Sequence, residues 1–132
     1  MAVFGSVTGR TYPLGRINIH VPGTPALLSQ NVPLTQGFGV AGSLSPTVRC
    51  SQIVFKSPGP GTVGNITNTG QIYVCYKGGN RTIQNSILYD LDPGAVFVMG
   101  SGAENSNYDP TAYVLDADNV DDGCRVFLIL GT

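Results

Sequence analysis

The clearest indication of the fold class is a set of short runs in which apolar and polar residues alternate. In residues 16–21, apolar side chains at positions 17, 19 and 21 alternate with Arg16, Asn18 and His20. Side chains two residues apart lie on the same face of a strand, so this run predicts a strand with one apolar face. Gly and Pro interrupt nearly every longer stretch, and no window keeps the roughly 3.6-residue period of a helix. Helix is therefore expected to be a minor component.

Further runs of strand character recur between segments rich in Gly, Pro, Asn and Asp. The expected strands are residues 37–40, 48–55, 71–76, 86–91, 95–99, 112–115 and 125–130. Roughly seven or eight short strands at these intervals predict an all-β fold, namely a single jelly-roll-like β-sandwich of antiparallel strands. The last run, residues 124–130, is apolar on both faces apart from Arg125. It is expected at the centre of a sheet or on a face that another subunit covers.

The N-terminal segment differs from the rest because its aromatic and aliphatic residues follow no sustained pattern. We expect residues 1–15 to form an extended arm and residues 16–132 to form the sandwich domain. An arm cannot bury its own apolar side chains, so Phe4, Tyr12 and Leu14 are candidate contacts with a neighbouring subunit. The alternative is that this segment forms an edge strand of its own domain.

The chain carries unusually little charge. Charged residues make up 11% of its 132 residues, against roughly 25% in an average soluble protein, and the formal net charge is -1. Because little charge repels one copy from another, we expect a homo-oligomer; the alternative is a small neutral secreted domain. The 7 basic residues stand singly, so we expect no nucleic-acid partner. No run reaches the ~18 apolar residues of a membrane span and no secretory signal begins the chain, so we expect no membrane partner and synthesis in the cytoplasm.

The sequence contains no arrangement of residues that is typical of catalysis or of a bound cofactor. His20 is the sole histidine, and no Cys, Asp or Glu stands near it in the sequence. Cys50, Cys75 and Cys124 are widely spaced and lie in strand-like runs, where a reduced cysteine behaves as a small buried hydrophobe. Nucleophile, zinc and phosphate-loop motifs are absent. We therefore expect no enzymatic activity and no cofactor.

Acidic residues gather in residues 116–123, which read Asp-Ala-Asp-Asn-Val-Asp-Asp-Gly. An EF-hand loop beginning at Asp116 would need Gly where Asp121 stands and Glu where Phe127 stands, so that calcium site is excluded. An irregular calcium site is one alternative, and ordinary turn chemistry is the other. If it is exposed, this segment is the most negative surface of the chain. Asp121 and Asp122 are then candidate contacts with a basic patch on a partner.

A polar turn, Asn-Thr-Gly at residues 68–70, leads directly into the next strand-like run. Asn and Gly accept positive φ, so the turn is expected to reverse the chain tightly. The alternation after it predicts that Ile72 and Val74 face the core while Tyr73 faces the opposite side. We interpret this turn as a joint of the scaffold and not as an active-site loop.

Several short motifs follow one another in a recognisable order. Thr-Pro-x-x-Leu at residues 24–28 is followed by Ile-Val-Phe at residues 53–55, by Asn-Thr-Gly-Gln-Ile-Tyr-Val at residues 68–74 and by Leu-Asp-Pro-Gly at residues 91–94. A hydrophobic strand after an Asp-rich turn ends the chain. This order, over roughly residues 16–131, resembles that of small β-sandwich structural proteins of tailed bacteriophage virions.

The resemblance implies a capsid decoration or cement protein. Such a protein binds the outer surface of the phage head as a homotrimer and stabilises the joints between copies of the major capsid protein. Its location is the capsid exterior, after synthesis in the cytoplasm of the host bacterium. One alternative is a tail, collar or head-fibre component of the virion. The other is a carbohydrate-binding β-sandwich module, in which stacking faces would come from Tyr73, Tyr76, Tyr89, Tyr108 and Tyr113.

Overall fold

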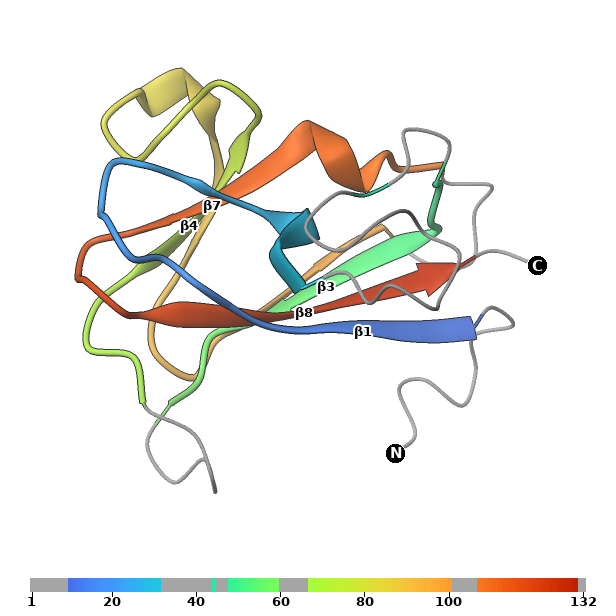
Figure 1. Cartoon of the computed structure of the whole chain (residues 1–132), viewed down its shortest axis with the longest axis horizontal. Helices are drawn as coiled ribbons and strands as arrows, with labels where there is room; N and C mark the ends of the chain where they lie inside the picture. Colours follow the sequence, from blue (N-terminus) through green and yellow to red (C-terminus); the bar gives the residue numbers. More distant parts are fainter. Residues whose placement is uncertain (1–9, 32–43, 45–47, 60–66, 101–106, 131–132) are drawn as a thin grey trace.

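The chain folds into short β-strands in the part that the structure describes. The computed structural model describes residues 10–31, 44, 48–59, 67–100 and 107–130 (Figure 1). The strands are β1 (Arg10–Asn18), β2 (Ala26–Leu27), β3 (Gln52–Lys56), β4 (Ile72–Tyr76), β5 (Ile87–Leu91), β6 (Val96–Met99), β7 (Tyr113–Ala117) and β8 (Gly123–Leu130). The 3-10 segments are η1 (Leu28–Asn31), η2 (Gln84–Ser86) and η3 (Pro110–Ala112). Among these residues, no helix has the length and apolar character that crossing a membrane requires.

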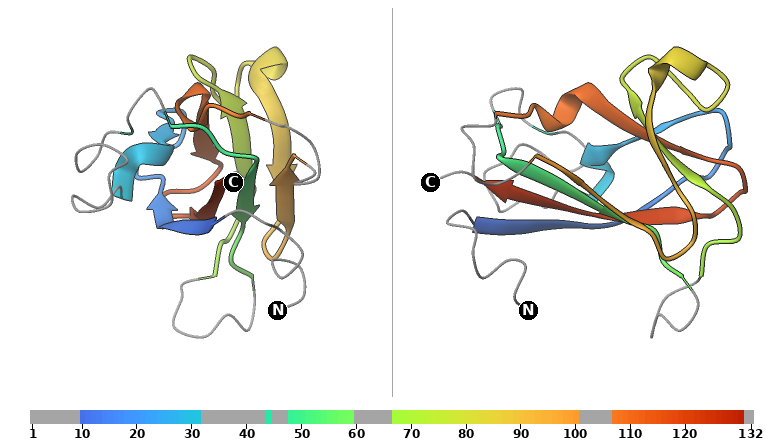
Figure 2. Two further views of the ribbon diagram at one scale, coloured as in Figure 1. Left: turned by 90° about the vertical axis from the view of Figure 1, so that its right-hand side faces the viewer. Right: turned by 180° about the vertical axis from the view of Figure 1, so that it is seen from behind.

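The strands form two antiparallel sheets that face each other. One sheet has the order β1-β8-β3-β6 and the other has the order β2-β7-β4-β5. Strands from the two ends of the chain pair in a nested order: β1 with β8, β2 with β7, β3 with β6 and β4 with β5. Successive pairs lie alternately in the first sheet and in the second. Views from the side and from behind show the two layers (Figure 2). This is the strand order of a jelly roll, and the all-β sandwich expected from the sequence is confirmed.

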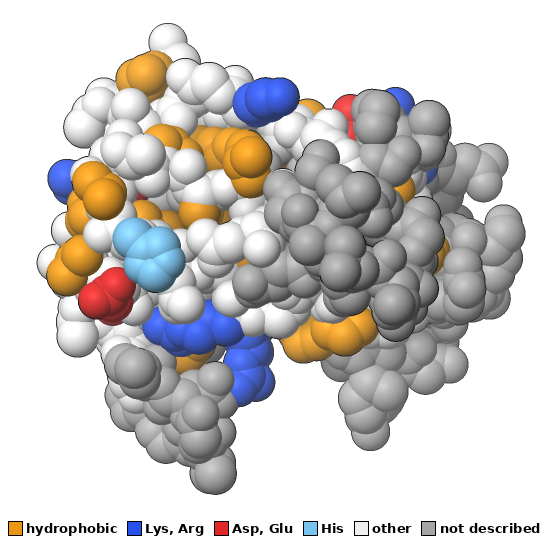
Figure 3. Space-filling view, viewed as in Figure 1, with side chains coloured by type: hydrophobic (Ala, Val, Ile, Leu, Met, Phe, Trp, Pro, Cys, Tyr) orange, Lys and Arg blue, Asp and Glu red, His pale blue; other side chains and the backbone are white. Residues whose placement is uncertain are grey.

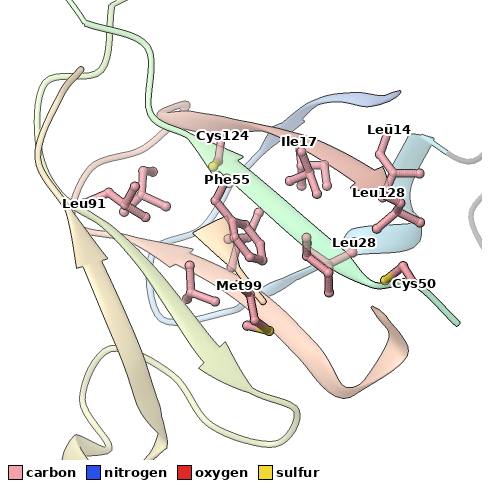
Figure 4. Packing of buried hydrophobic residues seen from close by; sticks show 14 of the residues in the cluster. Leu14, Ile17, Leu28, Cys50, Phe55, Leu91, Met99, Cys124 and Leu128 are labelled. Atoms are coloured by element: carbon pink, nitrogen blue, oxygen red, sulfur yellow. The ribbon is translucent and has the colours of Figure 1, made fainter. Parts of the chain in front are cut away.

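The core lies between the sheets and is built from alternate residues of the strands. In β8, Cys124, Val126 and Leu128 face the opposite sheet and are fully buried. Phe55 of β3 has the largest of the fully buried side chains and belongs to the same core cluster (Figure 4). Burying one such side chain stabilises the fold by roughly 1.5–3 kcal/mol. β8 lies between β1 and β3, which confirms that the most apolar strand is central.

The first strand begins earlier in the chain than the alternation predicts. β1 pairs antiparallel with β8, and Arg10 lies opposite Leu130. Leu14 is buried in the core of its own domain, whereas residues 1–9 lie outside the described part of the chain. Residues 10–15 are therefore the edge strand of the alternative prediction, and the predicted boundary between arm and domain does not hold.

A bulge in β1 is the physical reason for this difference. The register against β8 shifts between Pro13 and Gly15, so Leu14 is the extra residue of the bulge. Gly15 has a φ of 75°, a conformation that costs glycine little. Because of the extra residue, Leu14 and Ile17 both face the core although they stand three positions apart. Strict alternation therefore finds the strand only from the bulge onward.

The remaining predicted strands match the structure to within a few residues, with three differences. β2 is a two-residue strand that no run in the sequence indicated. The predicted strand at residues 48–55 contributes only its second half to β3, because Cys50 forms an isolated bridge with Tyr108. The predicted strand at residues 37–40 lies outside the described residues.

A close approach between two glycines leads to a first prediction. A Cβ built on Gly59 would lie 2.6 Å from the Cα of Gly94 and 2.8 Å from its N. The Gly94 N–H also donates to Ser57 O at 2.8 Å, so the turn cannot retreat without weakening that bond. We expect Gly59→Ala to lower the free energy of unfolding by about 1–3 kcal/mol in urea denaturation. An unchanged midpoint would show that the turn between β5 and β6 moves freely.

Candidate interaction surface

The Asn-Thr-Gly turn is fixed by hydrogen bonds inside the fold. The buried amide of Asn68 donates to Ser57 Oγ at 2.8 Å and to Gly123 O at 2.7 Å, and it accepts from Gly123 N at 2.9 Å. Asn68 thereby ties the segment before β4 to the start of β8. The expected positive φ is absent from both Asn68 and Gly70. Gly70 instead leaves room for Asn119, whose Nδ2 would lie 2.5 Å from a Cβ built there.

The Asp122 carboxylate also stabilises this turn. Its carboxylate accepts hydrogen bonds from the N–H groups of Thr69 at 3.1 Å and Gly70 at 2.9 Å. These donors replace water around a carboxylate whose residue is only 3% exposed. The predicted contact between Asp122 and a basic patch on a partner does not fit this position, because the residue has almost no surface to offer.

Asp121 stands next in sequence but lies in solvent. It is the one described residue other than glycine with a positive φ, of 63°. Its Oδ1 lies 3.4 Å from Nδ1 of His20, and both side chains are largely exposed. Figure 3 shows the histidine beside an acidic side chain, with basic side chains close below. Asp121 therefore stays a candidate surface contact, whereas the buried Asp122 stabilises the Asn-Thr-Gly turn.

The three candidate contacts near the N-terminus are placed differently from one another. Phe4 lies outside the described residues. Tyr12 is partly buried and packs against the core of its own domain, and Leu14 belongs to that core. Tyr12 and Leu14 are therefore used by the sandwich itself, which leaves them little surface for a neighbouring subunit.

A second buried carboxylate, that of Asp116 in β7, holds two loops. It accepts hydrogen bonds from the N–H groups of Gly23 at 2.9 Å, Arg81 at 2.8 Å and Ala117 at 2.8 Å. Gly23 lies in the loop after β1, and Arg81 lies in the turn after β4. One fully buried carboxylate thus fixes both segments against the outer side of the sheet. The sequence did not reveal this role, because Asp116 reads there as one member of an Asp-rich run.

The described residues do not assemble a cluster that could hold a metal ion. No group of three His, Cys, Asp or Glu side chains among them is placed to hold a metal ion. A pocket of about 150 Å³ lies between η1 and η3, with Leu28, Lys77 and Tyr113 in its wall. An open hollow of about 370 Å³ lies beside the β4–β5 turn, with Tyr76 and Asn85 in its wall. The described wall residues of both hollows include no carboxylate, histidine or cysteine.

The three cysteines are free thiols buried in the fold. Burial raises the pKa of Cys50 to about 12, that of Cys75 to about 11 and that of Cys124 to about 12, because the thiolate would lose its hydration. A thiol that is both inaccessible and protonated is a poor nucleophile. The cysteines therefore act as small apolar side chains, as the sequence predicts.

The thiol pKa values predict a loss of stability at alkaline pH. The unfolded chain releases its thiol protons near the ordinary pKa of 9.0, whereas the folded chain holds those of Cys50 and Cys124 to about 12 and that of Cys75 to about 11. The folded state then binds more protons than the unfolded state, so the free energy of unfolding should fall across this interval. Urea midpoints from pH 8 to about 11 measure the fall, which should be smaller for Cys124→Ala. If the urea midpoint fell equally with pH in the wild type and in Cys124→Ala, the loss of stability could not be assigned to the Cys124 thiol.

Apolar side chains remain exposed along one edge of the sandwich, where β5 and β6 lie. Phe97 of β6 stacks on Tyr89 of β5, with ring centroids 4.4 Å apart and planes 8° apart. Phe97 also stacks on the buried Phe55, at 6.0 Å. The two aromatic rings close the core at this edge, yet Tyr89 remains 44% exposed, and Val96 and Val98 on the other face of β6 are 51% and 42% exposed. We call Tyr89, Val96, Phe97 and Val98 the apolar edge.

A row of basic residues crosses the neighbouring strands. Arg16 of β1 lies opposite Arg125 of β8, and Arg125 lies opposite Lys56 of β3. Within the described residues, the ion pairs involve neither Lys56 nor Arg125. Like charges directly opposite on a sheet repel each other, so this basic row costs some stability in the isolated chain. The sequence did not reveal it, because these residues stand far apart and only the register of the sheet brings them together.

Comparison with known proteins identifies no relative of this chain. A scan against models of protein families, a search of curated proteins and a search of solved structures each found no match.

Proposed function

We propose that this chain is a structural protein of the tailed bacteriophage virion, a capsid decoration or cement protein. The observation that supports the proposal is that several buried polar side chains make hydrogen bonds within the fold, while apolar and basic side chains remain on the surface. Asn68, Asp116 and Asp122 serve the fold, while the surface offers the apolar edge and the basic row. Jelly rolls are common in viral capsid domains and in lectins, so the fold suits the proposal without deciding it. The order of the short sequence motifs favours the virion.

The proposed work is mechanical and needs no catalysis or cofactor. Copies assembled as a homotrimer bind the exterior of the phage head and bridge neighbouring copies of the major capsid protein. Each bridge adds apolar and polar contacts that exist only in the closed shell, so it lowers the free energy of that shell relative to its separated parts. Neither nucleic acid nor a membrane takes part.

We place the contact with the capsid at the basic row. Carboxylates on the partner would relieve the repulsion between Lys56 and Arg125, neither of which forms an ion pair with a carboxylate among the described residues. Lys56→Glu should therefore weaken binding to phage heads. Lys77→Glu changes the net charge equally at another exposed lysine, in the turn after β4, and serves as the control.

Co-sedimentation with phage heads that lack the protein tests both statements. The wild-type chain should pellet with the heads to saturation, Lys77→Glu should do the same, and Lys56→Glu should need roughly tenfold more protein for half-saturation, about 1.4 kcal/mol in binding free energy. Wild-type chain that stays in the supernatant would reject the decoration role. Equal binding by both variants would reject the basic row as the contact.

One observation favours the carbohydrate-binding alternative. Tyr76 is half exposed beside the open hollow at the β4–β5 turn, where Asn85 offers an amide. An exposed aromatic face and a polar side chain are what a sugar ring requires. A glycan array decides between the two readings: binding that Tyr76→Ala abolishes would support the lectin, and an array without binding would remove it.

A further inference from the structure

We propose that β6 is a self-association strand, which pairs with β6 of a second copy of this chain about a two-fold axis. The proposal goes beyond the virion role and does not depend on it. It concerns a contact of two-fold symmetry, which is distinct from the three-fold contacts of the proposed trimer.

The backbone of β6 presents hydrogen-bonding groups to an open edge. β6 is the last strand of its sheet and pairs only with β3 among the described strands. The N–H of Ser57 donates to Ala95 O at 2.9 Å, just before β6 begins. Amides in an antiparallel pair point alternately toward and away from the partner strand, so the N–H and C=O groups of Val96 and Val98 point away from β3. These groups are the ones that a further strand would use.

The side chains of β6 lack the features that usually keep sheet edges apart. Natural edge strands are protected by lysine, proline, inward-facing charge or a bulge. β6 reads Val-Phe-Val-Met, and its register against β3 has no shift. Val96 and Val98 are about half exposed, although valine favours the interior. An unprotected apolar edge of this kind is a template for strand pairing.

A second copy suits this edge because the strand is complementary to itself. A two-fold axis through Phe97 would place Val96 of each copy opposite Val98 of the other, in hydrogen-bonded pairs. The two Phe97 residues would then lie directly opposite each other, in the closer pair that favours aromatic contacts. The strand carries no charge, so no like charges meet on it. The net charge of -1 leaves little repulsion between copies.

The contact also uses the other layer of the sandwich. Tyr89 of β5 stacks on Phe97 and is exposed at the same edge, so pairing of the two β6 strands would bring the Tyr89 side chains of both copies toward the join. One strand pair and two pairs of aromatic rings make an interface smaller than roughly 1,200 Å², which is typical of weak and reversible association. We therefore expect a dimer that forms as concentration rises.

Sedimentation velocity over a concentration series tests the proposal on the full chain. The wild type should pass from monomer toward larger species. Val98→Lys, which places a charge on the open edge, should raise the dissociation constant at least tenfold, about 1.4 kcal/mol. Val120→Lys adds the same charge at an exposed valine in the turn before β8 and should behave as the wild type. A wild type that is monomeric throughout, or equal association by both variants, would overturn the proposal.

Cross-linking then tests the register. The native thiols are buried, so only an introduced cysteine should react with a short bis-maleimide. In the proposed register the two Val98 positions are diagonal neighbours, roughly 7–8 Å apart, and the distance between their Cβ atoms is somewhat shorter. Val98→Cys should therefore give a covalent dimer, whereas Val120→Cys should not. A concentration series that contains only monomer and trimer, with no dimer that Val98→Lys removes, would reject the β6 contact alone. A dimer that Val98→Lys removes, formed by a wild-type chain that does not bind phage heads, would reject the decoration role alone.

Discussion

Replacing Asp116 with alanine is expected to lower the free energy of unfolding by about 4 kcal/mol. The change removes the acceptor of three backbone N–H groups, those of Gly23, Arg81 and Ala117, at 2.8–2.9 Å. Hydrogen bonds to a charged group are worth roughly 1.5–3 kcal/mol each, and the two loop donors recover part of that from water. Domains are stable by only about 5–15 kcal/mol, so the loss should be evident in a urea titration at neutral pH.

Asp118→Ala provides the control for this effect. Asp118 lies two residues further along the chain and is exposed, where its carboxylate pairs with Arg81 at 3.4 Å and accepts from the Tyr73 hydroxyl. Exposed pairs contribute little, so the expected loss is at most about 1 kcal/mol. If the two variants unfolded at the same urea concentration, the buried carboxylate would not be what fixes the loops.

Replacing Asn68 with alanine is expected to cost about 3 kcal/mol of folding stability. The side-chain amide makes three hydrogen bonds of 2.7–2.9 Å with Ser57 and Gly123, and its loss removes the side-chain partner of both the N–H and the C=O of Gly123, which is buried. Asn119→Ala is the matched control, because that amide lies at the surface and donates to Thr69 Oγ1 at 3.0 Å. A cost of about 1 kcal/mol or less for Asn68→Ala, or equal urea midpoints for the two variants, would show that the turn does not depend on Asn68.

The stabilities of Asn68→Ala and Asn119→Ala also distinguish a scaffold role from an active-site role for the Asn-Thr-Gly turn. A residue that serves only a binding site can be replaced with little effect on stability, and sometimes with a gain. The turn joins the segment before β4 to the start of β8 through Asn68, and the Asp122 carboxylate accepts a hydrogen bond from its backbone. A stability loss at Asn68 would therefore support the interpretation that this turn is a joint of the fold.

The sequence predicted those strands in which alternation is regular and the flanking turns are clear. β4 is the clearest case: Ile72 and Val74 are fully buried in the core, while Tyr73 lies on the other face and donates its hydroxyl to Asp118. β8 was also placed correctly at the centre of a sheet, because its apolar residues cover both faces. In both strands a local pattern carries the information that the fold uses.

The alternation of apolar and polar residues did not predict the start of β1 or the edge strand β2, and each failure has a physical cause. The positive φ of Gly15 allows a bulge in which Leu14 is the extra residue. Leu14 and Ile17 therefore face the core three positions apart, and the two-residue alternation is interrupted between them. β2 has only two residues, Ala26 and Leu27, and it exists because they pair with β7. Neither a bulge nor a two-residue pairing leaves a period in the sequence.

The candidate surface was harder to predict, because it depends on which strands become neighbours. Asp121 and Asp122 look equivalent in the sequence, yet one is exposed and the other is buried behind the Asn-Thr-Gly turn. Lys56 and Arg125 stand far apart in the sequence and lie directly opposite in the sheet. The apolar edge likewise appears only once β6 is known to be the last strand. Such features follow from long-range pairing, which a local pattern does not encode.

The copy number of this chain in purified phage particles tests the proposed decoration role without any mutation. Quantitative gel densitometry or mass spectrometry against the major capsid protein gives that number without any mutation. A decoration protein should be present in hundreds of copies per particle, in a fixed ratio to the major capsid protein. About a dozen copies or fewer would indicate a tail, collar or head-fibre component, and absence from the particle would contradict the virion role.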